Sequence, residues 1–348
     1  MIEISDTIDV ETYLKLRSVP TIDVRSPSEF AKGHICGALN IPLFNDDERA
    51  QVGIAYKNRG RNQAIALGLR LVGEKGESLI ESLSQFEQGE QVFVHCWRGG
   101  MRSEAFAWLT LRTGLRSRRL VGGYKAFRST AHASFAEHKQ IVILSGYTGV
   151  GKTALLEDLR SAGEQVIDLE ALACHRGSAF GGIGQPDQPT VEQFENKLFD
   201  EWSDIDPNRP VWIEDESQSI GRINLPTPLW SQMKDAPGIF AESDRESRVE
   251  LLVREYGDLP AGALGDAIGR VKKRLGGLRY QNAMEALERN EIAKFADIAL
   301  SYYDDAYRTA AEKRPRAKLV TYSLKRAGVA DSLTDLKRLG QELLTPCC

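Results

Sequence analysis

A short apolar run that leads into a glycine-rich loop constrains the fold of this chain more than any other feature. Residues 141–144 read Ile-Val-Ile-Leu, and GYTGVGKT at 146–153 follows with the spacing G-x-x-x-x-G-K-T. In such a loop the backbone N–H groups and the N-terminus of the next helix converge on phosphate oxygens. The pattern therefore predicts a buried parallel strand, a phosphate-binding loop and a helix over 152–160.

The residues of this loop have distinct expected roles. The backbone amides cradle a diphosphate, and Gly146, Gly149 and Gly151 let the backbone approach it closely. The Lys152 ammonium neutralises the outer phosphates, and the Thr153 hydroxyl reaches Mg²⁺ if the ligand carries one. The motif predicts phosphate binding without identifying the molecule that carries the phosphate.

The segment VWIEDES at 211–217 predicts another strand of the same sheet, with acidic residues at its end. Glu214 and Glu216, with Asp215 between them, are candidates to face the metal or to activate a water. A solvated acidic turn is the alternative. The NKxD motif that reads a guanine base is absent from the chain, so GTP specificity is not indicated.

The sequence QVFVHCWRGGMRS begins as a buried strand and continues as a second glycine-containing loop. Cys96 is followed by five residues and then by Arg102, and we expect Ser103 to cap the next helix. The loop N–H groups and the helix N-terminus favour the thiolate of Cys96. Because Arg98 and Arg102 add positive charge, the loop can hold a persulfide, a perselenide, a phosphate or an arsenate. A small cysteine packed in the core is the alternative.

Short β-branched runs alternate with helical patterns in both halves of the chain, which predicts an α/β protein with parallel sheets. The polar stretch 129–140 separates the halves, so we expect domains over 1–135 and 136–348. From about residue 260 the pattern becomes mostly helical. The second domain is therefore expected to carry a helical C-terminal part.

Composition restricts the class of protein further. Hydrophobic residues make up 42% and charged residues 27% of the 348 residues, which excludes a disordered or coiled-coil chain. Five cysteines without a CxxC pair exclude a disulfide framework and a zinc ribbon. The first eleven residues do not resemble a signal peptide, and no apolar run approaches the roughly 20 residues that span a bilayer. We expect a cytoplasmic protein without a membrane partner.

The net charge of −4 means that any contact with nucleic acid depends on local basic patches. Two segments, 112–128 and 270–279, contain Lys and Arg and no acidic residue. Most such runs are only solvated faces, but two of them beside two phosphate-competent loops make RNA binding an equal alternative. The candidate RNA-binding residues are Arg118, Arg119, Lys272, Lys273 and Arg274.

Three segments of the first half, in the expected order, resemble a rhodanese domain. They are DVRSPSEFAKGHICGALNIP at 23–42, VHCWRGGMRS at 94–103 and LVGGYKAF at 120–127. The resemblance implies that Cys96 carries a chalcogen as a covalent adduct. The loop is one residue longer before its arginine than in ordinary sulfurtransferases, and so resembles the phosphatase-like branch or a variant for a larger atom.

Further segments, together with the order of the two loops, resemble the bacterial tRNA 2-selenouridine synthase family. They are LEALACHRGSAFGG at 169–182, IEDESQSIGRINLP at 213–226, RLGG at 274–277 and YYDDAY at 302–307. The resemblance implies that wobble 2-thiouridine of tRNA is geranylated with geranyl diphosphate. Selenium from selenophosphate then replaces the geranylthio group.

The same resemblance implies roles for individual residues. Cys96 would carry selenium as S-selanylcysteine, with Arg98 and Arg102 orienting selenophosphate, while Lys152 stabilises the departing diphosphate. No tightly bound cofactor is expected, and the partners are tRNA and a supplier of selenophosphate. Three alternatives stay open: an ATP-dependent RNA sulfurtransferase, a Cys-dependent phosphatase or arsenate reductase, and a nucleotide-sensing RNA-binding module.

Overall fold

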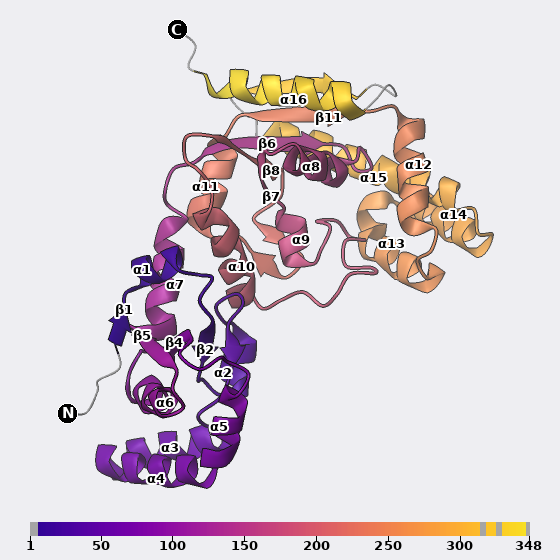
Figure 1. The fold of residues 1–348 in the computed structure, drawn as a ribbon. Coiled ribbons are helices and arrows are strands. Elements are labelled where there is room, and N and C mark those ends of the chain that lie inside the picture. Colours follow the sequence, from indigo (N-terminus) through magenta and orange to yellow (C-terminus); the bar gives the residue numbers. More distant parts are fainter. Residues whose placement is uncertain (1–5, 314–317, 325–328, 346–348) are drawn as a thin grey trace. The chain divides into compact units, whose positions relative to one another are not determined.

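The computed structural model describes residues 6–313, 318–324 and 329–345, and the chain divides into two compact units (Figure 1). The N-terminal unit is Met1–Ser134 and the C-terminal unit is Phe135–Cys348. Each contains a five-stranded parallel sheet with helices packed against it, so the predicted α/β class is confirmed. Cys347, Cys348 and the side chain of Tyr307 lie outside the described part of the chain.

The N-terminal sheet has the strand order β1-β5-β4-β2-β3. Its strands are β1 (Asp6–Ile8), β2 (Thr21–Asp23), β3 (Leu39–Asn40), β4 (Gln91–His95) and β5 (Arg116–Leu120). The helices are α1 (Val10–Lys15), α2 (Pro27–Lys32), α3 (Asp46–Arg59), α4 (Arg61–Glu74), α5 (Gly76–Leu83), α6 (Met101–Arg112) and α7 (Gly123–Ser134). Since β2 and β4 are parallel neighbours, their carboxyl ends meet, with Asp23 in register with His95.

The core of this unit explains why β4 forms a central strand. Val92, Phe93 and Val94 are fully buried, and Val92 and Val94 pack with Ile22 of the neighbouring strand and Phe106 of α6. A strand that is buried on both faces reads as a continuous apolar run, as this one does. The chain leaves the core directly after β4, and Cys96 stands at that exit.

The C-terminal sheet has the order β12-β11-β6-β8-β7. Its strands are β6 (Gln140–Gly146), β7 (Gln165–Ile167), β8 (Pro210–Glu214), β11 (Gly238–Glu242) and β12 (Leu319–Ser323), beside a small antiparallel pair, β9 (Ser219–Ile220) and β10 (Ile223–Asn224). The helices are α8 (Lys152–Ser161), α9 (Leu169–Ala173), α10 (Val191–Ser203), α11 (Thr227–Asp235), α12 (Arg245–Tyr256), α13 (Ala261–Leu275), α14 (Gly277–Glu288), α15 (Ile292–Lys313) and α16 (Val329–Leu344).

The predicted helical part after residue 260 is present as α13, α14 and α15, which share an apolar core with α12. The chain then returns to the sheet through β12 and α16, which the sequence pattern did not reveal. β12 is an edge strand that alternates between exposed and half-buried residues, so it lacks the apolar run of a central strand. α16 packs so closely on β8 that a Cβ at Gly340 would lie 2.5 Å from the Trp212 ring.

Two expected element boundaries differ from the structure. α7 continues to Ser134, so the polar stretch between the halves begins inside a helix. The helix after the cysteine loop begins at Met101 rather than at Ser103. Within the described ranges, no helix combines the length and the apolar character needed to cross a bilayer.

Candidate functional site

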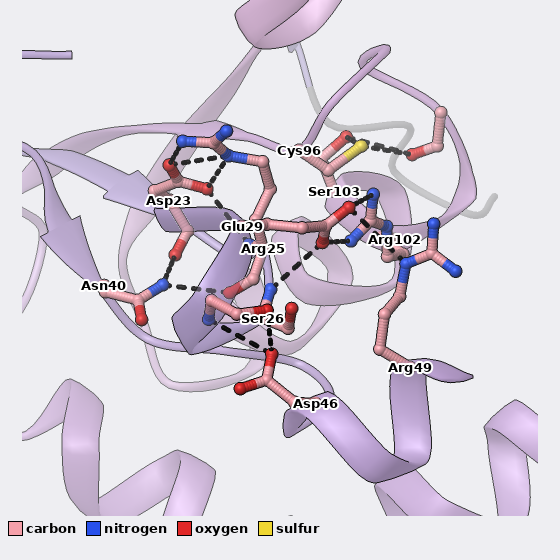
Figure 2. A network of polar contacts seen from close by, with 12 residues as sticks. Asp23, Arg25, Ser26, Glu29, Asn40, Asp46, Arg49, Cys96, Arg102 and Ser103 are labelled. Atoms are coloured by element: carbon pink, nitrogen blue, oxygen red, sulfur yellow. Dashed lines mark hydrogen bonds and ion pairs between the residues drawn. The ribbon is translucent and has the colours of Figure 1, made fainter. Parts of the chain in front are cut away.

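Cys96 follows β4 directly and is 3% exposed (Figure 2). Its Sγ lies 3.4 Å from Ser103 Oγ and 4.0 Å from Gly100 O. Ser103 also donates to Gly100 O over 2.9 Å, so it belongs to the first turn of α6. The expected N-cap role of Ser103 is therefore wrong, because Gly100 occupies the N-cap position and Ser103 contacts the thiol instead.

The start of α7 fixes the shape of the cysteine loop. Tyr124 N–H donates to Cys96 O over 2.9 Å, and Lys125 N–H donates to Trp97 O over 2.9 Å. Gly99 adopts φ +65°, and a Cβ there would lie 2.6 Å from the Leu120 carbonyl oxygen. Only glycine fits such a close approach in the left-handed region, which explains Gly99, and the same holds for Gly122 and Gly123 at φ +72° and +60°. α6 has no side-chain cap, so its first N–H groups remain available to an anion beside the thiol.

Arg102 is bound by a carboxylate in this structure. Its Nη1 donates to Glu29 Oε2 over 2.5 Å, and Glu29 also accepts the Ser26 N–H over 3.2 Å and lies 3.5 Å from Arg49 Nε (Figure 2). Burial raises the pKa of Glu29, but the Arg102 hydrogen bond and charge outweigh it and hold the pKa below its usual value. Glu29 is thus ionised, and an oxyanion that binds Arg102 must share the guanidinium with it.

Glu29 was missed in the sequence because Arg102 lies 73 positions away. The only local signal is the capping box that Ser26 and Glu29 form at the start of α2. Arg98, the other predicted oxyanion ligand, is exposed in the loop. Arg98 and Arg102 therefore both belong to the segment beside Cys96, with Arg102 committed to an internal partner.

A buried ion pair lies at the carboxyl end of β2. Arg25 donates to Asp23 Oδ2 over 2.6 Å and 2.9 Å, and its guanidinium stands 3.9 Å from the centre of the Tyr124 ring. Burial raises the pKa of Asp23, yet His95 and Arg25 outweigh it and keep the pKa low. Burial lowers the pKa of His95 below its usual value, so the guanidinium of Arg25 is the permanent positive charge beside this carboxylate. Arg25 contacts the ring of Tyr124, and the backbone N–H of Tyr124 donates to Cys96 O. The ion pair therefore stabilises the start of α7 beside the cysteine loop.

The predicted phosphate-binding residues all lie in the turn from β6 into α8. Gly146, Gly149 and Gly151 have φ of 153°, 78° and 88°, and a Cβ at Gly146 would lie 2.5 Å from Ala241 O. Lys152 Nζ donates to Gly146 O over 3.0 Å, so the lysine curls back over the loop. Thr153 is exposed at the start of the helix.

A side chain of α12 stabilises the phosphate loop at 146–153 through a hydrogen bond and a contact with an aromatic ring. Arg248 Nε donates to Thr148 O over 2.9 Å, and its guanidinium stands 4.9 Å from the centre of the Tyr147 ring. Asp304 of α15 accepts from Arg248 Nη2 over 2.5 Å. The loop is therefore held by side chains of two helices that its own sequence does not contain.

Glu216 meets a carboxyl group that the sequence did not reveal. Its side chain is hydrogen-bonded to Glu170 of α9, and both carboxyls interact electrostatically with Lys152. Burial first, and then the charge of Glu216, raise the pKa of Glu170 to about 9. Gly177 passes directly over the pair, since a Cβ there would collide with Glu216 Oε1 and lie 2.7 Å from Glu170 Oε1. One proton is thus shared by two carboxyls beside the phosphate-loop lysine.

Glu214 has a different environment from its neighbours. It is 2% exposed, and its Oε1 accepts the Glu170 N–H over 2.6 Å. Burial, followed by the charges of Asp168 and Glu170, raises its pKa well above the usual value, which favours the protonated form of this carboxyl. Asp215 accepts a hydrogen bond from Ser145 Oγ over 2.8 Å. Glu214 therefore binds the backbone of α9 through the Glu170 N–H, whereas the carboxyl of Glu216 interacts electrostatically with Lys152.

The five predicted RNA-binding residues belong to the two different units. Arg118 belongs to β5, where it pairs with Asp6 at 3.0 Å, and Arg119 follows it in the same strand. The remaining three are exposed in the last turn of α13: Lys272, Lys273 and Arg274. Lys272 stands 4.6 Å from the centre of the Tyr280 ring, so one face of that ring is covered. Among the described residues, no cluster of three or more His, Cys, Asp or Glu can hold a metal ion, so the Mg²⁺ role of Thr153 stays a prediction.

Comparison with known proteins identifies relatives of both units. The rhodanese-like domain family matches residues 9–130, and the tRNA 2-selenouridine synthase AAA domain family matches residues 139–263. A tRNA 2-selenouridine synthase of Cupriavidus pinatubonensis is 36% identical, covering 92% of this chain and 96% of that protein. One of Hahella chejuensis is 37% identical, covering 89% of this chain and 90% of that protein.

Among solved structures, the N-terminal domain of a putative ATP/GTP binding protein from Clostridium difficile 630 is 34% identical. The match covers 36% of this chain and 98% of that chain, with a TM-score of 0.34.

Proposed function

The chain belongs to the tRNA 2-selenouridine synthase family, and from this premise we propose that it converts wobble 2-thiouridine of tRNA to 2-selenouridine in two steps. One observation carries the proposal. The same chain holds a cysteine at an uncapped helix N-terminus and a lysine curled over a phosphate loop. Such a pair provides one site for a chalcogen and one for a diphosphate leaving group. The tRNA substrate is expected in the cytoplasm.

The first step we propose is geranylation of the thiocarbonyl sulfur. A bond forms between this sulfur and C1 of geranyl diphosphate, the C1–O bond breaks, and diphosphate leaves with the electron pair while the base loses its N3 proton. Lys152 and the loop N–H groups stabilise the charge that grows on the diphosphate. The proton shared by Glu170 and Glu216 removes one negative charge from beside that group.

The second step we propose is delivery of selenium at the Cys96 loop. The selenium of bound selenophosphate attacks C2 of the uracil ring, and the geranylthiol leaves with the electron pair of the C2–S bond, since alkylation has made the sulfur a good leaving group. Water then cleaves the Se–P bond, so that phosphate is released and the 2-selenouridine forms without a change of oxidation state. Arg98 and Arg102 would orient selenophosphate, and Ser103 Oγ, 3.4 Å from Sγ, would donate to the thiolate. A selenophosphate-supplying enzyme is then the partner, with Mg²⁺ at Thr153 if the diphosphate requires it.

Glu29 does not supply the general acid that the phosphatase alternative, raised by the cysteine-to-arginine spacing, requires. A phosphatase of this kind needs a protonated carboxyl to protonate its leaving group. Glu29 is the carboxyl bound to Arg102, and Arg102 holds its pKa below the usual value despite burial. An ionised carboxylate cannot donate that proton.

Nucleoside mass spectrometry tests the proposal. Purified protein is incubated with 2-thiouridine-containing tRNA, geranyl diphosphate and selenophosphate, and each is omitted in turn. We expect selenium for sulfur in the full mixture and a geranylated nucleoside when selenophosphate is absent. Lys152→Ala should lose both products, whereas Cys96→Ala should keep geranylation and lose selenation. Cys36→Ala, which removes another cysteine of the same unit that is not in a disulfide, is the control. An unchanged nucleoside in every mixture, or a product that requires ATP, would contradict the proposal.

A further inference from the structure

The helical hairpin of α3 and α4 presents a basic tip beside the cysteine loop. Residues 49–73 contain five Lys and Arg and no Asp or Glu. A single residue, Gly60, joins the two helices and adopts φ +83°, so Arg59 ends α3 and Arg61 begins α4 (Figure 1). A turn this tight brings the charges at the two helix ends together instead of spreading them along a loop.

The cations of this tip lack counter-ions. Lys57, Arg59 and Arg61 are exposed, and within the described ranges none of them forms an ion pair with an acidic side chain. Some cations elsewhere on the surface do have acidic partners, as Arg118 has Asp6 at 3.0 Å and Arg279 has Asp305 at 3.3 Å. Three unpaired charges within five residues repel one another, which folding alone does not favour. An anionic partner would remove that repulsion.

The tip lies against the segment that carries the thiol. Arg61 Nη2 contacts Met101 Sδ at 4.0 Å, and Met101 is the first residue of α6, five positions after Cys96. Arg98 is exposed in the intervening loop. Tyr56, the neighbour of Lys57 in α3, is 57% exposed and offers an aromatic face that can stack on an unpaired base. Positive charge and an aromatic ring thus border the approach to Cys96.

We propose that the α3–α4 tip, defined by Tyr56, Lys57, Arg59 and Arg61, binds the phosphate backbone of the RNA whose base reaches Cys96. This inference rests on the proposed function, since it names the surface that holds the same substrate. RNA fits better than an anionic membrane because the charge is confined to one turn, includes an exposed aromatic ring and adjoins the cysteine loop. The predicted basic residues of β5 and α13 do not combine these features.

The test compares tRNA binding by the full-length protein and by the triple variant Lys57→Gln, Arg59→Gln, Arg61→Gln. Fluorescence anisotropy with labelled tRNA gives Kd at several salt concentrations. Each lost phosphate contact lowers the slope of log K against log salt by roughly 0.7 to 0.9, so we expect a decrease of about 2 and a Kd raised about tenfold or more. Arg70→Gln is the matched control, because Arg70 is exposed in the same hairpin about 13 Å along α4 from Arg61.

Two further readouts separate the surface from the chemistry. The alkylation rate of Cys96 should be equal in the triple variant and the wild type if the loop is intact, and the nucleoside product should reappear at saturating tRNA. Equal Kd and slope in the two proteins would overturn the proposal and leave the proposed function standing. Conversely, weakened tRNA binding by the triple variant with no nucleoside conversion by wild type would support the surface and contradict the function.

A separate experiment tests the alternative that the tip binds an anionic membrane. Vesicles of phosphatidylglycerol and phosphatidylcholine are sedimented with both proteins. Vesicle binding that the triple substitution abolishes, together with unchanged tRNA binding, would assign the tip to an anionic membrane and overturn the RNA proposal. If wild type bound no tRNA at all, both the proposed RNA-binding surface and the proposed function would be contradicted.

Discussion

The carboxyl groups of Glu170 and Glu216 are hydrogen-bonded to each other beside Lys152, although the two residues are 46 positions apart in the chain. Two carboxyl groups that are hydrogen-bonded to each other cannot both be ionised without strong repulsion. The pair of Glu170 and Glu216 therefore retains a proton. Because the protonated carboxyl beside Lys152 is neutral, it does not offset the positive charge of the lysine ammonium. The pair therefore prepares the phosphate loop for an anionic ligand.

This pair predicts a pH-dependent stability. The pKa of Glu170 is about 9 in the folded protein, against the ordinary 4.5, so its favourable contribution is complete below about pH 4.5 and is lost as pH rises toward 9. We expect wild type to lose up to about 1.4 kcal/mol of unfolding free energy per pH unit relative to Glu170→Gln between pH 6 and 9. Urea unfolding at several pH values measures the difference.

The control for this experiment is Glu157→Gln, which removes an exposed carboxyl of α8. Its stability should run parallel to that of wild type over the same pH range. Parallel curves for Glu170→Gln and wild type would show that the carboxyl pair does not hold the proton.

Gly177 gives a second prediction, based on close contact. A Cβ at this position would collide with Glu216 Oε1 and crowd Glu170, and the residue also adopts φ +63°. Gly163 has φ +82° with no atom within 4 Å of a built Cβ, so Gly163→Ala isolates the backbone cost, which is about 1–2 kcal/mol. We expect Gly177→Ala to destabilise the protein more than Gly163→Ala does and to weaken binding of inorganic diphosphate. Chemical denaturation and calorimetric titration measure the two effects, and equal losses in both variants would rule out the contact.

The parts of the fold that were predictable are those encoded locally. β4 and β6 were evident because a strand buried on both faces is a continuous apolar run, and the phosphate loop because its residues are contiguous. Glu170 was not evident, because it approaches Glu216 only when β7 pairs with β8, which places Ile167 opposite Ile213. Glu29 likewise reaches Arg102 only because β2 and β4 are neighbours. Pairings between distant strands leave no local pattern to read.

The Glu29–Arg102 pair predicts a change in oxyanion affinity. Glu29→Gln removes a negative charge next to Arg102 while keeping a group of similar shape that can still accept its hydrogen bond. An incoming oxyanion then no longer competes with a carboxylate, so we expect the variant to bind tungstate about threefold to tenfold more tightly. Protection of Cys96 from iodoacetamide by increasing tungstate measures the affinity.

The control for this experiment is Asp47→Asn, which removes an exposed acid of the first turn of α3. Weaker protection in Glu29→Gln would mean that the carboxylate orients Arg102 for the anion.

The buried Asp23–Arg25 pair predicts a large loss of stability on removal of one partner. Both side chains have no exposed surface, and Arg25 donates to Asp23 Oδ2 over 2.6 Å. Arg25→Met would leave the buried Asp23 carboxylate without the guanidinium that donates hydrogen bonds to it. Losing one partner of a buried pair costs about 3–5 kcal/mol, so we expect urea unfolding to report a loss of that order. The double variant Asp23→Asn, Arg25→Met removes both charges and should recover part of it. A double variant that is less stable than Arg25→Met alone would show that the charge of Asp23 is balanced by another group.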